Sequence, residues 1–530
     1  MQSCVVIVYF ITHFFLSFTT PTHSLPLSTK SRWIVDDITG KRVKLAGLNW
    51  AGHVGPMLPE GLDKRPLTEI AKHIALTGFN NVRLTYATYM YTRHANLTVL
   101  ESFQNLGLES AIRGIRINNP FLLDLTLVEA HMTVVDVLAL NGVMVLLDCQ
   151  VSEPIWCCGD NDGNGFWGDR DFQPEEWLRA LTIVAALYQH NPMVIAMSLR
   201  NELRGPRQNP EDWYYHVRKG AKAIHKTNPN VLVVVSGLSY DLDLSFLKKK
   251  PLRLRLDNKL VYEAHRYAFS KGDSDEWLHQ PLNQVCDSIT RDINNSSTFL
   301  IKGPNPAPLY ITEFGINMEG TNQADNDFFT CFLLYLAEND LDWNLWAVQG
   351  SYYIRLGRQD DEEKYALFNH NMTSIRNPQF HQKLVSIQGK IQDPYSAVTR
   401  HERIFHPKSG ACISVDEKLE LESSGCHSFG RHWRYHNNVI RLLGTEFCLT
   451  SAGEGRPVIL TKDCSLRKSM WKSVSNYQLA NYRDNLCLHY DPAYSEKILT
   501  TECICPDDDS SGCQENPSSQ WFKLITSNAK

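Results

Sequence analysis

The chain has 530 residues, of which 43% are hydrophobic and 21% are charged, a composition typical of a soluble globular protein. Its length permits two or three domains, or one large barrel with an appended module. With a formal net charge of −5 and a pI near 6.4, the composition gives no electrostatic footprint for nucleic acid or an anionic membrane, and neither partner is expected.

The N-terminal segment has the pattern of a secretory signal. Its first 24 residues contain no Lys, Arg, Asp or Glu, an apolar core runs from Val5 to Phe18, and residues 22–24 offer a cleavage point. This predicts a signal peptide over residues 1–24 and a secreted, extracellular protein. The alternative is a short buried helix or a membrane anchor. No later run reaches the roughly 18 apolar residues that a membrane span needs.

Cysteine usage agrees with an oxidising compartment. The chain has 14 cysteines, and eight of them lie between Cys412 and Cys513. In that compartment the Asn-x-Ser/Thr sequons would be glycosylation sites, at Asn96, Asn294, Asn295 and Asn371.

Residues 25–392 alternate apolar or β-branched runs with segments of helical character. Eight such runs occur, at 43–50, 79–86, 143–149, 194–202, 231–238, 260–267, 309–315 and 341–348. Near-continuous apolar strands between helices are typical of a parallel sheet covered by helices, and eight of them predict an α/β fold, a (β/α)8 TIM barrel. A doubly wound open sheet is the alternative, but no Gly-rich phosphate loop follows the first run.

Most of these runs end in polar or aromatic residues. In a (β/α)8 barrel the carboxyl ends of the strands converge on one face, where the active site lies. The residues predicted to meet there are Asn49, Trp50, Arg83, Asp148, Asn201, Glu202, His265, Tyr267, Glu313 and Trp346.

Two of the carboxylates among these residues, Glu202 and Glu313, have the placement that glycoside hydrolysis requires. Glu202 ends an apolar run, where an unpaired carboxylate costs several kcal/mol or shifts its pKa. Either Arg200 or Arg204 neutralises it, or the position holds a carboxyl group of altered pKa. Glu313, in "ITEFG", would face it across the barrel mouth, so that one acid donates a proton and the other attacks. For either residue alone, a salt bridge at the barrel end is the simpler interpretation.

With these motifs, residues 32–390 resemble glycoside hydrolase family 5, a family of (β/α)8 retaining glycosidases. "IAMSLRNEL" is similar to the Asn-Glu signature of that family and "LYITEFG" to the stretch that carries its nucleophile. The resemblance implies that Glu202 is the acid/base and Glu313 the nucleophile. It also implies substrate-binding roles for Arg83, Asn201, His265, Tyr267 and Trp346, to which Trp50 and Gln150 are added by position.

The resemblance assigns each group a chemical role. Glu202 would be protonated at rest, with a pKa raised by burial and by the charge of Glu313. Arg83 and Tyr267 would keep Glu313 ionised. Asn201 would hold the sugar 2-hydroxyl, a contact that strengthens in the transition state. Trp346 would form an apolar floor under a sugar ring.

The sequence departs from the family after the third run. Where family members often carry Asp-x-His, this chain has Asp148-Cys149-Gln150, and Gln150 can form hydrogen bonds but carries no charge. The insertion that follows, 156–169, contains the vicinal pair Cys157 and Cys158. We expect a disulfide-tied loop there without a metal, because the Glu that closes a calcium loop is absent. Its aromatic residues are candidate sugar platforms: Trp156, Phe166 and Trp167.

The composition changes at a predicted linker, residues 393–403, and a repeat follows in residues 404–530. Three pairs of cysteines have similar spacing: Cys412 with Cys426, Cys448 with Cys464, and Cys487 with Cys503. Trp433 and Trp471 follow the second cysteine by seven residues, and the third copy has Trp521 after an insert. Three copies that each close a disulfide loop predict a threefold β module.

This module resembles a ricin-type β-trefoil lectin domain. Of the Gln-x-Trp signature of that family, the third copy keeps Gln520-Trp521, shifted from the usual order. The resemblance implies possible sugar-binding positions at Asp416 and Asp491. A purely structural module that has lost sugar binding is the alternative.

These observations predict a retaining β-glycosidase that acts on a β-linked glucan or mannan as a monomer, without cofactor or metal. A transglycosylase on the same fold would pass the covalent intermediate to a sugar hydroxyl instead of water. A carbohydrate-binding protein with an inactive barrel would lack a catalytic carboxylate, and both carboxylates are present.

Overall fold

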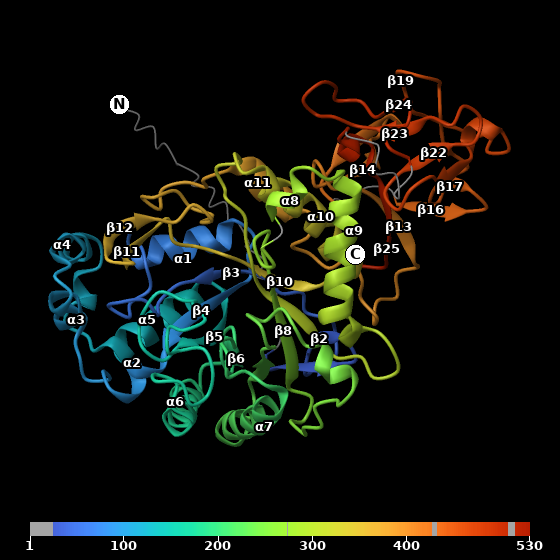
Figure 1. The fold of residues 1–530 in the computed structure, drawn as a ribbon. Helices are drawn as coiled ribbons and strands as arrows, with labels where there is room; N and C mark the ends of the chain where they lie inside the picture. Colours follow the sequence, from blue (N-terminus) through green and yellow to red (C-terminus); the bar gives the residue numbers. More distant parts are fainter. Residues whose placement is uncertain (1–24, 273, 427–431, 507–514, 530) are drawn as a thin grey trace, which may run out of the picture.

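The computed structural model describes residues 25–272, 274–426, 432–506 and 515–529, so the predicted signal peptide lies outside the described residues. The chain forms a larger lobe, a barrel surrounded by helices, and a smaller strand-rich lobe beside it (Figure 1). Within the described ranges, no helix combines the length and the apolarity that crossing a bilayer would require.

Eight parallel strands close into the predicted barrel. Their spatial order is β10-β3-β4-β5-β6-β7-β8-β9, and β10 pairs with both β3 and β9, which rules out the open sheet. The strands read as apolar runs because the barrel interior covers one face and helices cover the other. Their bounds are β3 Ala46–Trp50, β4 Asn81–Ala87, β5 Met144–Val151, β6 Val194–Ser198, β7 Leu232–Val235, β8 Leu260–Arg266, β9 Leu309–Phe314 and β10 Asp342–Leu345.

Helices lie outside the barrel strands (Figure 1). Several begin with strong capping signals: Thr126 and Glu129 form a capping box at the start of α5, and Asn209 caps α7, where Pro210 occupies the first turn. The bounds are α1 Leu67–Leu76, α2 Thr88–Thr92, α3 Val99–Asn105, α4 Glu109–Asn118, α5 Leu127–Leu140, α6 Pro174–Leu187, α7 Pro210–Thr227, α8 Ser274–Trp277, α9 Leu282–Ser296, α10 Gln323–Asn339 and α11 Pro378–Val385. Short 3-10 turns occur at Pro120–Leu122, Ser245–Lys248, Thr298–Ile301, Arg467–Ser469 and Pro517–Gln520.

Two hairpins complete the larger lobe. The first joins β1 (Leu27–Lys30) to β2 (Trp33–Asp36), and its buried Leu27 and Ile34 pack with Leu45 and Leu146 in one apolar cluster. The second joins β11 (Ser351–Arg355) to β12 (Arg358–Glu362) after the eighth barrel strand. This second hairpin supplies a wall of the cavity described below.

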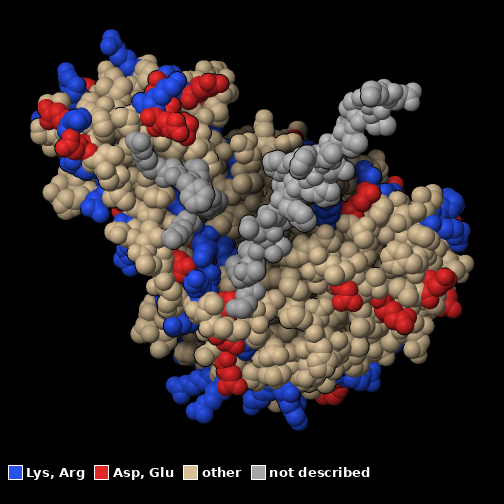
Figure 2. Space-filling view, turned by 180° about the vertical axis from the view of Figure 1, so that it is seen from behind, with Lys and Arg blue, Asp and Glu red and all other residues tan. Residues whose placement is uncertain are grey.

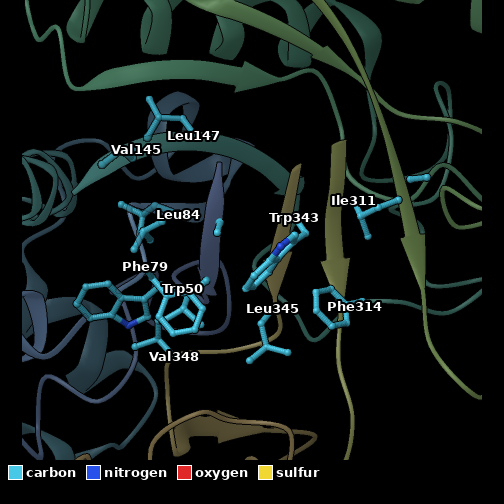
Figure 3. Packing of buried hydrophobic residues seen from close by; sticks show 14 of the residues in the cluster. Trp50, Phe79, Leu84, Val145, Leu147, Ile311, Phe314, Trp343, Leu345 and Val348 are labelled. Carbon is cyan, nitrogen blue, oxygen red and sulfur yellow. The ribbon is translucent and has the colours of Figure 1, made fainter. Parts of the chain in front are cut away.

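Trp50 belongs to the core, contrary to its predicted role as a substrate contact. Its side chain has no exposed surface, and its indole nitrogen donates a hydrogen bond to the Glu60 carbonyl at 2.9 Å. Figure 3 shows Trp50 in the apolar cluster that also contains Phe79, Leu84 and Val348. The reason is the alternation of side chains along a strand: Asn49 points toward the barrel interior, so Trp50 points outward.

The strands of the smaller lobe form two antiparallel sheets, one of eight strands that includes β13, β16, β17 and β25 and one of five strands that includes β21 and β22. Isolated bridges beside these strands link the two sheets, at Val439↔Met470 and Gln478↔Trp521. Each of the three predicted copies contributes two of these six strands. The bounds are β13 His401–His406, β14 Ala411–Val415, β15 Leu421–Ser424, β16 Trp433–His436, β17 Val439–Leu442, β18 Cys448–Thr450, β19 Arg456–Pro457, β20 Ile459–Thr461, β21 Trp471–Ser473, β22 Leu479–Asn481, β23 Cys487–His489, β24 Leu499–Thr501 and β25 Lys523–Ser527.

The predicted disulfide pairing within each copy is confirmed in the structure. The bonds are Cys412–Cys426, Cys448–Cys464 and Cys487–Cys503. A further bond that the sequence analysis did not predict, Cys286–Cys331, joins α9 to α10 in the larger lobe. Each bond restricts the unfolded chain, which favours the folded state.

The third copy places Phe522, and not Trp521, at the repeated aromatic position. In the second copy the Trp471 amide donates to the Asn438 carbonyl at 2.7 Å, and in the third the Phe522 amide donates to the Tyr477 carbonyl at 2.8 Å. Trp521 instead stacks on Tyr477, with ring centroids 4.6 Å apart. The expectation for Trp521 was therefore wrong by one residue: Phe522, two residues after Gln520, occupies the position that Trp471 has in the second copy.

The two lobes pack against each other. Tyr477 donates to Asp287 on α9 at 2.8 Å, and the Lys523 ammonium lies 3.4 Å from Glu338 on α10. The predicted linker is tied to the end of the chain, because Asp393 and Asn528 exchange hydrogen bonds of 2.8 and 2.7 Å. Figure 2 shows acidic and basic side chains interspersed on the visible face of the smaller lobe.

Candidate active site

A cavity of about 810 Å³ is lined by residues at the carboxyl ends of the barrel strands. Six predicted site residues line it, namely Gln150, Glu202, His265, Tyr267, Glu313 and Trp346. The other lining residues are His53, Trp156, Cys157, Cys158, Tyr240, Leu242, Phe269, Ser270, Arg355, Arg358, Asp361, Glu362, Glu363, Lys364 and Tyr365.

Glu202 follows β6 in a strained turn whose backbone is fixed by its neighbours. Its φ of 43° lies in the left-handed region, its amide donates to Asp241 Oδ2 at 3.1 Å, and its carbonyl accepts from Arg204 Nη1 at 2.8 Å. Arg200 turns elsewhere and donates to the Asn164 carbonyl at 2.7 Å. Neither arginine therefore forms an ion pair with the Glu202 carboxyl group.

The second alternative for Glu202, a carboxyl group of altered pKa, agrees with its surroundings. Burial raises the pKa of Glu202 to about 7, against the opposing charges of Arg204 and Arg83. The carboxyl group can therefore hold a proton near neutral pH, as a general acid must.

Glu313 lies near the end of β9, and each oxygen of its carboxylate accepts a hydrogen bond from a side chain. Arg83 Nη1 donates to Glu313 Oε2 at 3.0 Å, and the Tyr267 hydroxyl donates to Oε1 at 2.7 Å. Burial raises the pKa of Glu313 and the Glu202 charge adds to this, while a positive charge on His265, the Arg83 charge and the Tyr267 hydrogen bond oppose the rise. Both oxygens of this carboxylate are therefore held as acceptors, as predicted for Arg83 and Tyr267.

The two carboxyl groups lie close together across the cavity. One oxygen of Glu202, one oxygen of Glu313 and a ring nitrogen of His265 all lie within 4.8 Å of one another. Retaining glycosidases separate their carboxyl groups by about 5–5.5 Å, whereas inverting ones need about 6.5–9.5 Å to admit a water. These three atoms could also share a metal ion, but the hydrogen bonds of Arg83 and Tyr267 already account for the Glu313 oxygens.

Arg83 and Asn201 lie beneath the cavity and do not line it. Arg83 is fully buried and also contacts Asn49 Oδ1 at 2.9 Å, Asn201 Oδ1 at 2.8 Å and Asp148 Oδ1 at 3.0 Å. Its guanidinium orients Glu313 from below. Gln150 Oε1 lies 3.5 Å from Arg83 Nη1, and this residue does line the cavity.

The vicinal disulfide Cys157–Cys158 covers Asn201. The Asn201 amide nitrogen lies 3.6 Å from one sulfur and 3.7 Å from the other, and its side chain has no exposed surface. A sugar hydroxyl would reach Asn201 only if the disulfide moved. The predicted contact with the 2-hydroxyl is therefore closed off in this structure.

Only one of the three predicted sugar platforms in the insertion faces the cavity. Trp156 lines it, whereas Phe166 and Trp167 are buried, and Trp167 stacks on His216 with centroids 4.8 Å apart. The acidic stretch of the insertion forms its own turns: Asp162 accepts hydrogen bonds from the amides of Gly159 at 3.0 Å and Asn164 at 2.8 Å. The same Asp162 pairs with Arg204.

The β11–β12 hairpin adds a polar wall that the sequence analysis missed. Glu363 accepts from Trp346 Nε1 at 3.4 Å, from the Tyr352 hydroxyl at 2.7 Å and from Arg355 Nη1 at 3.0 Å. These bonds hold Trp346, which is 6% exposed, at the cavity surface. The only signal was the charged stretch 358–364, and such stretches are usually solvated faces. His53 and Tyr240 were missed as well.

The two candidate lectin residues are used in local structure. Asp416 Oδ1 accepts from the amides of Lys418 at 2.9 Å and Glu420 at 2.8 Å. Asp491 accepts from Lys408 Nζ at 2.7 Å and from the Ala493 amide at 3.1 Å.

Comparison with known proteins agrees with this site. The cellulase family (glycosyl hydrolase family 5) matches residues 36–351. A glycosyl hydrolase 5 family protein from Chamaecyparis obtusa is 44% identical over 529 residues, 96% of this chain and 94% of that protein. An endoglucanase from Paenibacillus polymyxa is 22% identical over 337 residues, 60% of this chain and 79% of that enzyme.

Solved structures share the fold of the larger lobe. The hyperthermophilic endocellulase of Pyrococcus horikoshii has a TM-score of 0.55 at 19% identity, covering 69% of this chain and 98% of that one. The catalytic domain of the major endoglucanase from Xanthomonas campestris pv. campestris has a TM-score of 0.55 at 21% identity, covering 68% and 99%. The family match, the full-length relative and the paired carboxylates together establish that the chain belongs to glycosyl hydrolase family 5 and is an O-glycosyl hydrolase with a carbohydrate substrate.

Proposed function

We propose that this protein is a retaining β-glycosidase that cleaves a β-linked glucan or mannan by double displacement. The observation that carries this proposal is the distance between carboxyl oxygens of Glu202 and Glu313, which is at most 4.8 Å. That distance suits direct attack of one carboxylate on the anomeric carbon and is too short for an inverting mechanism.

In the first step a carboxylate oxygen of Glu313 bonds to the anomeric carbon. The bond to the glycosidic oxygen breaks, and that oxygen takes the proton of Glu202. In the second step Glu202, now a carboxylate, removes a proton from water, and the water oxygen displaces Glu313 from the anomeric carbon. Two inversions restore the original configuration, and both carboxyl groups return to their starting states.

The walls of the cavity suit a sugar chain. Trp346, Trp156 and Tyr267 present aromatic surface, and the β11–β12 hairpin presents charged groups that can bind hydroxyls. Support for a glucan comes from the relatives: the Paenibacillus polymyxa enzyme is named an endoglucanase, and a Pyrococcus horikoshii endocellulase was solved with cellotetraose.

A substrate screen tests the proposal. Purified protein is incubated with β-1,4-glucan, β-1,4-mannan, β-1,3-glucan and aryl β-glycosides, and the anomer released first is identified by NMR. We expect the β-anomer from at least one substrate. Release of the α-anomer, or activity that persists in Glu313→Ala, would contradict the mechanism. Adding an acceptor sugar distinguishes transglycosylation from hydrolysis, because only the former yields a longer glycoside.

We further propose that residues 1–24 direct secretion and that the smaller lobe is a ricin-type β-trefoil. The two sheets linked by isolated bridges, the three disulfide loops and the repeated aromatic position support the second proposal. Sequencing the N-terminus of protein recovered from culture medium tests the first. An experimental structure of the smaller lobe tests the second, and retention on insoluble polysaccharides tests whether it binds sugar.

A further inference from the structure

A chain of buried side chains runs from the acid/base residue to a carboxylate outside the cavity. His265 Nδ1 lies 2.9 Å from Glu202 Oε1, and His265 Nε2 lies 3.1 Å from the Thr312 hydroxyl oxygen. The same hydroxyl lies 2.7 Å from Glu263 Oε2. Glu263 and Thr312 have no exposed surface, and neither lines the cavity.

The hydrogen bonds fix the direction of this chain, because both Glu263 oxygens act as acceptors, Oε1 from the Ser198 hydroxyl and Oε2 from the Thr312 hydroxyl. A threonine hydroxyl has one proton, and Thr312 gives it to the Glu263 carboxylate. The hydroxyl oxygen can then only accept from His265 Nε2, which must carry a hydrogen. A neutral imidazole carries one N–H, so Nδ1 is a bare acceptor. The proton between His265 and Glu202 therefore belongs to Glu202.

The surroundings of His265 agree with a neutral ring. Burial lowers the pKa of His265 to about 4, so the ring is uncharged at neutral pH. The ionisable groups that face it come from several strands and loops: Arg83, Glu202, Asp241, Glu263, Arg266 and Glu313.

Neither Asp241 nor Ser198 offers His265 a different partner. Asp241 Oδ2 lies 3.6 Å from His265 Nε2, beyond hydrogen-bond range, and accepts from the Glu202 amide instead. Burial and the charges of Glu263 and Glu202 raise the pKa of Asp241 well above its usual value. The Ser198 hydroxyl donates to the other oxygen of Glu263, so both oxygens of that carboxylate act as acceptors.

We propose that Glu263, acting through Thr312, holds His265 in the Nε2–H tautomer and so keeps the catalytic proton on Glu202. Both are positioning residues, and the inference rests on the proposed role of Glu202 as the acid/base. In the opposite tautomer Nδ1–H would donate to Glu202 and stabilise its carboxylate. The enzyme would then lose the proton that the leaving oxygen needs.

A matched pair of variants tests the chain. Thr312→Val removes the hydroxyl at nearly constant volume, and Thr312→Ser keeps it. We expect the alkaline limb of the kcat/KM profile of Thr312→Val to move down by about one pH unit, a roughly tenfold loss above the limb. Thr312→Ser should restore the limb of the unmodified protein.

The tautomer can also be measured directly in the unmodified protein. In ¹⁵N-histidine-labelled protein at neutral pH, the His265 signals should show a protonated Nε2 and a bare Nδ1, with assignment by their loss in His265→Gln. A protonated Nδ1 in the unmodified protein would overturn the proposal, as would an unmoved alkaline limb in folded Thr312→Val. Because this spectrum needs no turnover, it separates failure of the tautomer from failure of the proposed activity.

Discussion

The acidic residues at the barrel mouth and those in the smaller lobe differ in their burial and in their partners. At the mouth, Glu202, Glu313, Glu263 and Asp241 are largely buried, and two of them face an 810 Å³ cavity. In the smaller lobe, the Asp416 carboxylate is a partner of nearby backbone amides, and Asp491 pairs with a lysine beside such an amide.

This difference distinguishes acids that take part in a reaction from acids that stabilise local structure. Taking a carboxylate out of water costs free energy unless hydrogen bonds and opposite charges replace the solvent, as Arg42 does for the buried Asp340 just ahead of β10. At the mouth, burial instead raises the pKa of Glu202 to about 7, as a proton donor requires. In the part of the smaller lobe that the structure describes, the three copies repeat features that stabilise a fold, namely three disulfides and the apolar positions of Trp433, Trp471 and Phe522. The predictions below test this contrast.

Removing the nucleophile should have the largest effect. Glu313→Ala leaves no atom to form the covalent intermediate, and we expect kcat to fall by about four orders of magnitude or more. Release of reducing sugar or of a nitrophenol measures it. Added azide should restore part of the turnover by attacking the anomeric carbon from the vacated side. A variant that turns over at the normal rate would place the nucleophile elsewhere.

Removing one hydrogen bond to the nucleophile should lower activity less and should shift the acidic limb of the pH profile. Tyr267→Phe removes the donor to Glu313 Oε1, and a hydrogen bond to a charged group contributes about 1.5–3 kcal/mol, so kcat/KM should fall about 10- to 100-fold. That bond lowers the pKa of Glu313, so its loss should move the acidic limb of the profile to higher pH. An unchanged acidic limb would argue against this assignment.

Neutralising the acid/base should stabilise the fold at alkaline pH. Because the folded state raises the pKa of Glu202 to about 7, it binds that proton more tightly than the unfolded chain does. Stability is therefore lost as the pH rises from about 4.3 toward 7. Glu202→Gln removes this loss, and its free energy of unfolding should exceed that of the unmodified protein by about 1–3 kcal/mol at pH 8. Melting curves should converge near pH 4, and a variant less stable at both pH values would contradict this.

Removing the vicinal disulfide should change substrate binding several-fold. Cys157→Ala with Cys158→Ala opens the cavity wall above Asn201, and we expect kcat/KM for oligosaccharides to fall about three- to tenfold. A dithiol reductant should lower the activity of the unmodified protein but not that of the double variant. Equal sensitivity of both would locate the effect in another disulfide.

Changing an acid of the smaller lobe should have the smallest effect. Asp491→Ala breaks a partly exposed ion pair with Lys408, which contributes less than about 1 kcal/mol. Because the carboxylate is already engaged, retention on an insoluble polysaccharide should change less than twofold. A large loss of retention would make this lobe a sugar-binding module and would break the contrast with the barrel.

Much of the fold was predictable because it depends on local patterns. Strands buried on both faces appear as apolar runs, and the even spacing of cysteines marks three copies of one loop. The errors were shifts of one residue, at Trp50 and at Trp521. Along a strand such a shift reverses the direction of a side chain, and no local pattern distinguishes the two faces of a strand that is apolar on both.

The site was predictable in its residue types but not in its contacts. Glu202 and Glu313 stood out because an unpaired carboxylate at the end of an apolar run costs free energy or shifts its pKa, and because the two together suit glycoside hydrolysis. Asn201 was expected at the substrate, yet a disulfide from the insertion covers it. The β11–β12 hairpin also escaped prediction, because its cavity-facing residues come from a charged stretch like those on solvated surfaces.

The sequence by itself determined the barrel, the paired cysteines and the two acids at the carboxyl ends of apolar runs, since each of these follows from residue type and spacing along the chain. Only the tertiary structure decided the distance between the two acids, the burial that raises the pKa of Glu202 and the hydrogen-bond partners of His265. Those properties arise from groups brought together from strands far apart in the chain, as when Thr312 on β9 meets His265 on β8, and no local pattern carries their geometry.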